Sequence, residues 1–248
     1  MTAPIAPPFC PPAGALRALA EAGYAVLAPQ ELLRVAGCAA GDFDGLIPAW
    51  DRLELDHHLR DGGRYRQRRH SCFRVKGDRA EPVPHRAHWQ SEDYNALHGG
   101  IERWFEPLED DFSRSGAFER LLVGLGSVFG ALLPGDIWHV EAHAFRIDTT
   151  GGIGRPTPEG AHRDGVDFVA VVLIARVDIK GGETRVFEAR GPAGQRFTLT
   201  EPWSALVLDD SRVVHETTPI QPIDDAGHRD TLVLTYRRDG FQEPPAGI

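Results

Sequence analysis

The sequence predicts an α+β fold in which a helical N-terminal layer packs on a jelly-roll core, and three observations lead to this prediction. Residues 115–132 place large apolar side chains at spacings of three and four, which is typical of a buried amphipathic helix. From Ile137 onward, short apolar or β-branched runs are broken by glycine, proline and aspartate. Helical patterns do not separate these runs, which favours an antiparallel sandwich or barrel over parallel βαβ units.

The first half of the chain is mixed but rich in predicted helix. In chain order the predicted elements are a helix over 13–22, a strand over 24–28, a short helix over 30–36, a helix from Asp42 toward Leu59, and the helix over 115–132. The first of these ends at Gly23, as a helix with a C-terminal glycine does. Asp42 is a candidate N-cap for the fourth helix, and Pro48 disturbs its first turns.

The second half predicts seven short strands. They cover residues 137–147, 166–179, 183–188, 196–200, 204–209, 212–217 and 230–237. Residues 169–174 are apolar on both faces, so the second strand is expected to be central in its sheet. We therefore expect a flexible tail over 1–12 and a single domain over 13–248, helix-rich over 13–135 and with its jelly-roll core over 136–240.

Composition and charge exclude several classes of protein. The chain has 27 basic and 36 acidic residues, and a net charge of −9 disfavours binding to nucleic acid. Uninterrupted apolar stretches stay well below the roughly 18 residues that a membrane span requires, and the N-terminus has no cationic or apolar leader. The three cysteines have no zinc-site or disulfide spacing. We expect a soluble cytoplasmic protein without a membrane or nucleic-acid partner; the sequence leaves its oligomeric state open.

One pattern of residues points to metal chemistry. His162 and Asp164 are two apart at the start of a predicted strand, so their side chains are expected on the same side of the backbone. His215 lies 51 residues after Asp164, in the sixth predicted strand. A histidine and a carboxylate two apart, followed by a distant histidine, is the sequence form of the two-histidine, one-carboxylate site that leaves open positions on a ferrous ion. Solvated His-x-Asp pairs are common, so further features are needed.

Two further features support a site at this place. Arg229 and Thr231 begin the last predicted strand and project to one face, and a guanidinium with an adjacent hydroxyl suits the far carboxylate of a dicarboxylate ligand. The opposite face of that strand carries large apolar side chains, as the wall of a barrel requires. Residues 148–161 form a loop rich in glycine and proline that leads directly into His162 and can close over a site.

These residues resemble the bacterial iron(II)/2-oxoglutarate dioxygenases typified by L-isoleucine 4-hydroxylase, which act on free amino acids. The resemblance extends from about residue 50 onward, and its specific part is the ordered set from His162 to Arg229. That set consists of Pro-Glu-Gly-Ala-His-Arg-Asp-Gly over 158–165, Gly-Gly-Glu over 181–183, Leu-Asp-Asp over 208–210, His215, and Arg-Asp over 229–230.

The resemblance implies a double-stranded β-helix core and an enzyme that uses Fe(II), 2-oxoglutarate and O2. It implies His162, Asp164 and His215 as catalytic iron ligands and Arg229 as the partner of the 2-oxoglutarate C5 carboxylate; Thr231 as a second partner follows from strand alternation. The implied reaction oxidises an aliphatic C–H bond of a small-molecule substrate, an amino acid or a derivative, most simply by hydroxylation, and converts 2-oxoglutarate to succinate and CO2. Two alternatives stay open, a non-catalytic cupin-like sensor of metal or 2-oxoglutarate and a hydroxylase of protein side chains.

Candidates for substrate binding are less specific. Arg64, Arg66 and Arg68 would share one face of a strand, and a buried arginine among them could bind a substrate carboxylate. Because 25 of the 27 basic residues are arginine, such a run also arises from composition alone. The resemblance favours Arg66 or Arg68. Arg146 on the first core strand is a competitor, and Glu159 beside the metal motif could bind an α-ammonium group.

The other histidines divide into two groups. His139 and His143 are four apart on a predicted strand and can face the pocket together. His70, His85 and His88 lie among polar residues, and we expect them at the surface.

Overall fold

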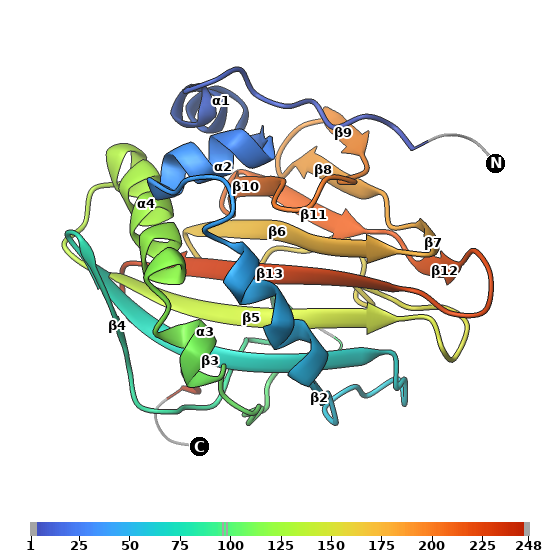
Figure 1. The fold of residues 1–248 in the computed structure, drawn as a ribbon. Coiled ribbons are helices and arrows are strands. Elements are labelled where there is room, and N and C mark those ends of the chain that lie inside the picture. Colours follow the sequence, from blue (N-terminus) through green and yellow to red (C-terminus); the bar gives the residue numbers. More distant parts are fainter. Residues whose placement is uncertain (1–3, 96, 98, 246–248) are drawn as a thin grey trace.

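The largest element of the fold is an antiparallel sheet (Figure 1). A computed structural model describes residues 4–95, 97 and 99–245 of the chain. Within these residues the sheet has eight strands, in the spatial order β1-β10-β6-β13-β5-β3-β2, with β4 also paired to β3. These strands are β1 (Tyr24–Leu27), β10 (Ala205–Asp209), β6 (Phe168–Val177), β13 (His228–Arg237), β5 (Trp138–Asp148), β3 (Arg66–Lys76), β2 (Glu54–Leu55) and β4 (Arg79–Pro82).

Smaller sheets lie against one end of the large sheet (Figure 1). One has the order β11-β8-β9 and the other pairs β12 with β7. Their strands are β11 (Val213–Thr217), β8 (Thr184–Glu188), β9 (Gly194–Phe197), β12 (Ile220–Pro222) and β7 (Ile179–Gly181). A large antiparallel sheet with a second, smaller layer of strands is the arrangement of a double-stranded β-helix.

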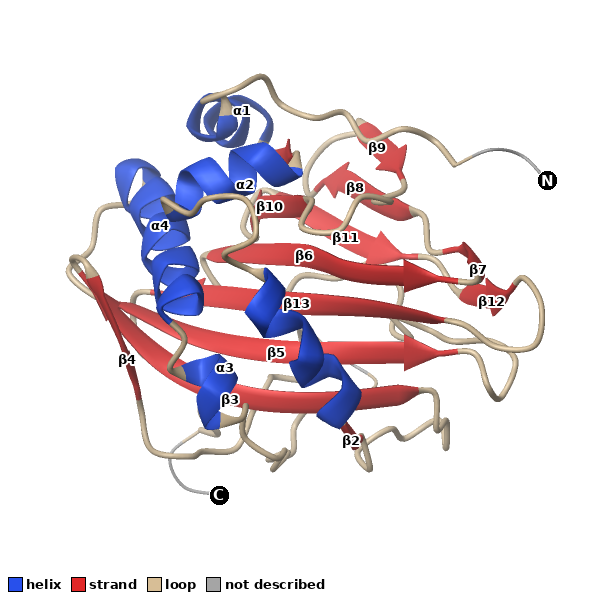
Figure 2. Cartoon of the chain, in the orientation of Figure 1, coloured by secondary structure: helices blue, strands red, loops and turns tan. Residues whose placement is uncertain are grey.

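The helices lie together across one face of the large sheet (Figure 2). They are α1 (Ala15–Ala22), α2 (Pro29–Ala36), the 3-10 helix η1 (Asp44–Arg52), α3 (Asp110–Ser113) and α4 (Gly116–Leu132). η1 is tied to the sheet by Trp50, whose indole N–H donates to the carbonyls of Phe145 on β5 and Thr231 on β13 at 3.1 and 3.3 Å. No helix in the described part of the chain is long and apolar enough to cross a membrane.

Strand alternation sends neighbouring side chains to opposite faces of the large sheet. Along β13, Leu232 and Leu234 enter the core shared with the helices, while Thr231 and Val233 face the other way. Along β6, Val172 joins the helix-side core, and Val169 joins a second core that includes side chains of β8 and β10. The face without helices is therefore left free to form a site between the large and small sheets.

Most predicted elements are confirmed within a few residues. The helix over 115–132 is α4, and Ser115 caps it by accepting the backbone N–H of Ala117 at 3.3 Å. The strand over 169–174 is central, because β6 pairs with both β10 and β13. The predicted glycine end of the first helix is also present, since Gly23 has a φ of 79°.

One predicted helix is wrong. The helix from Asp42 toward Leu59 is only a 3-10 helix that contains Pro48 and ends at Arg52. Proline lacks the N–H that a continued α-helix requires at that position. The tail over 1–12 is attached where it is described: the N–H of Cys10 donates to the carbonyl of Val26 at 2.8 Å. Residues 1–3 of that tail lie outside the described residues.

The contact between α4 and the sheet predicts a large loss of stability when it is truncated. The buried ring of Phe129 stacks on Phe168 of β6 with ring centroids 4.5 Å apart and lies edge-on to Tyr236 of β13 at 4.9 Å. We expect Phe129→Ala to lower the free energy of unfolding by about 3–5 kcal/mol in urea titrations. Phe187→Ala, at a position that is 36% exposed, should cost about 1 kcal/mol or less. Equal losses would contradict a tightly packed helix layer.

Candidate functional site

One pocket is lined by the face of the large sheet that the helices do not cover. Its walls come from β3, β5 and β13 on one side and from β11 and the loop before β6 on the other. Alternate residues of β5 (Glu141, His143, Phe145) and of β13 (Arg229, Thr231) reach it. The period of the strands therefore explains why polar side chains occur at every second position in two otherwise apolar strands.

His162, Asp164 and His215 meet in this pocket. They form a group whose potential ligand atoms all lie within 4.8 Å of one another. Asp164 Oδ1 is 3.9 Å from His162 Nε2, and Asp164 Oδ2 is 3.9 Å from His215 Nε2. These distances are too long for hydrogen bonds, and they leave room between the three side chains for an ion.

The two histidines are held together through their backbones. The N–H of His162 donates to the carbonyl of His215 at 3.1 Å, and the N–H of His215 donates to the carbonyl of His162 at 3.0 Å. Their rings consequently lie with centroids 4.7 Å apart. The expectation that His162 and Asp164 lie on a strand is wrong, since they precede β6 in a loop that makes only this isolated bridge.

Hydrogen bonding fixes the tautomer of His162. Its Nδ1 is 2.9 Å from the carbonyl of Gly160, so Nδ1 carries the proton and the lone pair of Nε2 faces the pocket. Burial opposes protonation of His162, but the carboxylates of Asp164 and Glu159 outweigh it and raise the pKa of this ring. Burial and the neighbouring His162 hold the pKa of His215 well below its ordinary value.

Asp210 holds the loop that carries Asp164. Its carboxylate accepts the backbone N–H groups of Asp164, Gly165 and Val166 at 2.9, 2.8 and 3.2 Å. Burial and the charge of Asp164 raise the pKa of Asp210 to about 7. Gly165 is required in this loop because its φ is 75° and a Cβ there would lie 2.5 Å from the ring of Tyr94.

Arg229 and Thr231 both line the pocket from β13 and are both buried. The Nη2 of Arg229 is buried without a hydrogen-bond partner among the described residues. Burial lowers the pKa of Arg229 to about 10, so its guanidinium still carries a positive charge at neutral pH. A buried cation with an unused donor is an incomplete interaction that an anionic ligand would complete.

The four candidates for substrate binding have different surroundings. Arg66 lines the pocket, but Asp56 already pairs with it at 2.7 Å. Arg68 and Glu159 also line the pocket, and Glu159 Oε1 is 3.5 Å from His162 Nε2. The structure does not bring Arg146 to the site. Its side chain lies on the opposite face of β5, where Asp230 accepts two hydrogen bonds from it at 2.8 and 2.7 Å.

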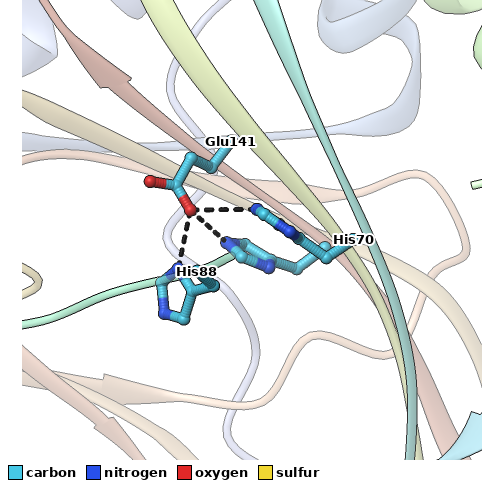
Figure 3. Close-up of side chains that lie close together, drawn as sticks. His70, His88 and Glu141 are labelled. Atoms are coloured by element: carbon cyan, nitrogen blue, oxygen red, sulfur yellow. Dashed lines mark hydrogen bonds and ion pairs between the residues drawn. The ribbon is translucent and has the colours of Figure 1, made fainter. Parts of the chain in front are cut away.

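A second group of side chains occupies another part of the pocket wall. This histidine–glutamate cluster consists of His70, His88, Glu141 and His143, all buried. Figure 3 shows one carboxylate oxygen of Glu141 at the centre of the contacts. That oxygen, Oε2, lies 3.0 Å from His70 Nε2, 2.6 Å from His88 Nδ1 and 3.8 Å from His143 Nε2.

Most of this cluster is not predicted from the sequence. The expectation that His70 and His88 lie at the surface is wrong; His70 is completely buried on β3, and His88 lines the pocket. Polar neighbours in the sequence misled the prediction because β3 carries a buried polar face. Arg103, which is 2% exposed and also lines the pocket, had no sequence signal at all. The prediction that His143 faces the pocket is confirmed, whereas His139 does not line it.

Among the comparisons with known proteins, a family model identifies the family of the chain. The family model described as 2OG-Fe dioxygenase matches residues 47–235. A crystal structure of a bsmA homolog from Methylobium petroleophilum PM1 is 54% identical, with a TM-score of 0.90 over 95% of this chain and 98% of that one. No curated protein matches the sequence.

Two more distant crystal structures share the fold. One is IDO from Bacillus thuringiensis, 18% identical, with a TM-score of 0.73 over 91% of this chain and 94% of that chain. The other is the Fe(II)/α-ketoglutarate-dependent dioxygenase TqaL, also 18% identical, with a TM-score of 0.69 over 90% of this chain and 84% of that one.

The cluster predicts specific histidine tautomers. Arg68 donates to Nδ1 of His143 at 2.8 Å, so His143 should carry its proton on Nε2, whereas His88 should carry it on Nδ1. Burial lowers the pKa of His88 to about 3 and that of His143 well below its ordinary value. Both rings should therefore stay neutral between pH 8 and pH 5, although a free imidazole titrates near pH ~6.5. Long-range ¹H–¹⁵N NMR spectra of the metal-free protein measure this directly, and an imidazolium signal from either ring at pH 6 would contradict it.

Proposed function

The chain belongs to the 2OG-Fe dioxygenase family, and from this premise we propose that it oxidises an aliphatic C–H bond of a small amino acid or amino-acid derivative. Enzymes of this family use Fe(II), 2-oxoglutarate and O2. The bound iron and its cosubstrates supply the oxidising chemistry: one oxygen atom of O2 enters the substrate, and the other enters succinate as 2-oxoglutarate loses CO2. Hydroxylation is the outcome that we propose for the substrate.

We infer that His162, Asp164 and His215 hold the iron. The donor set of two imidazoles and one carboxylate suits ferrous iron and leaves positions for other ligands. Two observations support this assignment. The three side chains approach a common point, and Nε2 of His162 faces the pocket. Asp210, which fixes the loop around Asp164 through three backbone hydrogen bonds, acts as a positioning residue.

We assign the far carboxylate of 2-oxoglutarate to Arg229 and Thr231. The unused Nη2 of Arg229 supports this role, because a guanidinium binds a carboxylate with two parallel hydrogen bonds and Arg229 has no competing partner at that atom among the described residues. Thr231, two residues after Arg229 on the same strand, also lines this pocket. Both side chains orient the cosubstrate and exclude water from the site.

The amino-acid substrate is inferred from the charges in the pocket. Beyond Asp164 and Arg229, the lining contains the guanidiniums of Arg68 and Arg103 and the carboxylates of Glu141 and Glu159. Apolar side chains, among them Val171 and Val233, complete the wall. A ligand with one negative group, one positive group and an aliphatic part matches this lining, and a free amino acid is the smallest molecule with all three. The resemblance to L-isoleucine 4-hydroxylase makes L-isoleucine the first candidate.

The proposal predicts that succinate formation depends on an amino acid. The protein is incubated with Fe(II), ascorbate and 2-oxoglutarate, and with each protein L-amino acid or its N-acetyl derivative in turn. At least one aliphatic amino acid should raise the rate of succinate release about tenfold or more over the rate without substrate. His215→Ala should abolish this release and weaken Fe(II) binding in equilibrium dialysis, because it removes one proposed ligand. His57→Ala, a change at an exposed histidine, is the matched control.

Two outcomes would contradict the proposal in different ways. Tight binding of Fe(II) and 2-oxoglutarate without turnover of any compound would favour a sensor. Turnover only with a peptide or a protein would favour a protein hydroxylase. Normal activity in His215→Ala would exclude His215 as an iron ligand.

Arg229→Ala separates cosubstrate binding from substrate binding. Loss of a buried charge-assisted pair should raise the KM for 2-oxoglutarate about 100-fold and change the KM for the amino acid far less. Steady-state kinetics with each compound varied in turn give both constants. Arg237→Ala, on the same strand but outside the pocket lining, should leave both unchanged. Equal increases in the two constants would argue against the assignment of Arg229.

A further inference from the structure

Two buried arginines beside the histidine–glutamate cluster lack a full set of partners. Arg68 donates from Nη2 to His143, and its Nε is buried without a hydrogen-bond partner among the described residues. Arg103 donates from Nη2 to Gln90 at 3.3 Å, and its Nε is likewise buried and unpartnered in the described part of the chain. Both guanidiniums line the pocket, so a ligand there can reach them.

The surroundings of Arg68 leave only the edge of its guanidinium for hydrogen bonding. Its central carbon lies 3.9 Å from the ring centroid of Phe105 and 4.7 Å from that of Phe145. These rings cover the guanidinium without neutralising it. Burial and the charge of Arg103 lower the pKa of Arg68, but a guanidinium stays protonated in proteins. Arg68 is therefore a fixed cation beside a second cation.

The buried donors in this part of the pocket are not fully used. Asp56 pairs with Arg66 at 2.7 Å. The charge of Glu141 acts on both Arg68 and Arg103, and the charge of Glu159 also acts on Arg103. Carboxylates therefore face these guanidiniums, but the Nε atoms of Arg68 and Arg103 have no hydrogen-bond partner among the described residues. A buried charged donor without a partner is unfavourable unless a ligand supplies the acceptor.

A metal ion does not fit beside these guanidiniums. A divalent cation in the cluster would lie close to Arg68 and Arg103, which would repel it. The hydrogen bond from Arg68 to Nδ1 of His143 also places the proton of that ring on Nε2, the nitrogen that faces Glu141 and that a metal would need. The cluster therefore acts as a set of neutral donors around a carboxylate.

Glu141 has one oxygen available for a ligand. Its hydrogen bonds from His70 and His88 both run to Oε2. Figure 3 shows its other oxygen directed away from the labelled rings. His143 lies between Arg68 and Glu141, with Nδ1 2.8 Å from the guanidinium and Nε2 3.8 Å from the carboxylate. A positive site and a negative site thus lie on opposite sides of one imidazole ring.

We propose that Arg68 and Arg103 bind the α-carboxylate of the amino-acid substrate and that Glu141 binds its α-ammonium group. This assignment rests on the proposed function and names the residues that recognise the head group. The spacing of the two sites suits two groups attached to one carbon atom. Glu159 has a different position, since it approaches His162 beside the proposed iron site.

Gln90 connects this head-group site to the proposed iron ligands. Its carbonyl oxygen accepts from Arg103 at 3.3 Å, and its amide nitrogen donates to Asp164 Oδ1 at 3.3 Å. Arg103 is therefore two hydrogen bonds from Asp164. If Arg103 holds the head group, the aliphatic part of a small amino acid lies against the proposed iron site. The position of the head group then determines which carbon is oxidised.

The first test compares an amino acid with its methyl ester, which lacks the negative charge. The probe is the most active amino acid of the succinate screen. The unmodified protein should prefer the acid over the ester by about 10- to 100-fold in kcat/KM. Arg103→Met and Arg68→Met should remove most of this preference by raising the KM for the acid, while the KM for 2-oxoglutarate stays within about twofold. Arg69→Met is the matched control, because Arg69 is the next residue on β3 and donates to backbone carbonyls outside the pocket.

The second test uses the carboxylic acid that lacks the amino group. Glu141→Gln should lower kcat/KM for the amino acid about tenfold or more and should change kcat/KM for the analogue little. Glu31→Gln, at a buried glutamate outside the pocket lining, should change neither. If Glu159→Gln instead gives the selective loss, the assignment of Glu141 is overturned.

The outcomes distinguish failure of the proposed function from failure of the head-group site alone. If no amino acid supports succinate release, the proposed function fails and the head-group site fails with it. If an amino acid is turned over but Arg103→Met and Arg68→Met keep the preference for the acid, as Arg69→Met does, only the head-group site is overturned. Thermal unfolding identifies a variant that does not fold, and Arg103→Lys then replaces Arg103→Met; it should keep part of the preference for the acid.

Discussion

Two backbone hydrogen bonds between His162 and His215 hold together the two histidines of the proposed iron site. Each residue donates its N–H to the carbonyl of the other, at 3.1 and 3.0 Å, and this isolated bridge joins a loop to strand β11. As a result, the imidazole rings of His162 and His215 lie with their centroids 4.7 Å apart. Asp210 adds the third constraint by accepting three N–H groups of the loop that carries Asp164. Because backbone contacts fix these positions, the three side chains should need little reorganisation to receive the iron ion that we propose.

The pocket around this centre contains buried cationic donors without partners. Arg229 has an unused Nη2, and Arg68 and Arg103 each have a buried Nε without a partner among the described residues. A buried charged donor without an acceptor is costly, so such groups persist where a ligand supplies the acceptor. We propose that two carboxylates do this, one from 2-oxoglutarate and one from the substrate. On this account the same electrostatic principle selects both molecules and keeps them in separate parts of one pocket.

The sequence predicted the fold where the pattern is strong. The spacing in 115–132 and the apolar run over 169–174 gave α4 and the central strand β6. It did less well where polar groups are buried. Strand β3 alternates buried arginine and histidine with less buried residues, so its hydrophobic pattern is absent, and His70 and His88 were expected at the surface.

Local spacing alone could not identify the whole site. His162, Asp164, His215 and Arg229 form a recognisable ordered set in the sequence, and the structure brings all four into one pocket. Arg103 lies in an irregular segment, and an isolated bridge of its backbone to His88 holds it beside the pocket. Long-range pairing of this kind depends on the tertiary fold, so spacing along the chain carries no signal for it.

The most direct measurement is the position of bound iron. Crystals of the protein loaded anaerobically with Fe(II) give an anomalous difference map at the iron absorption edge. Our account predicts a peak between Nε2 of His162, the carboxylate of Asp164 and Nε2 of His215, and none within the histidine–glutamate cluster. A peak among His70, His88, Glu141 and His143, with the first position empty, would contradict it.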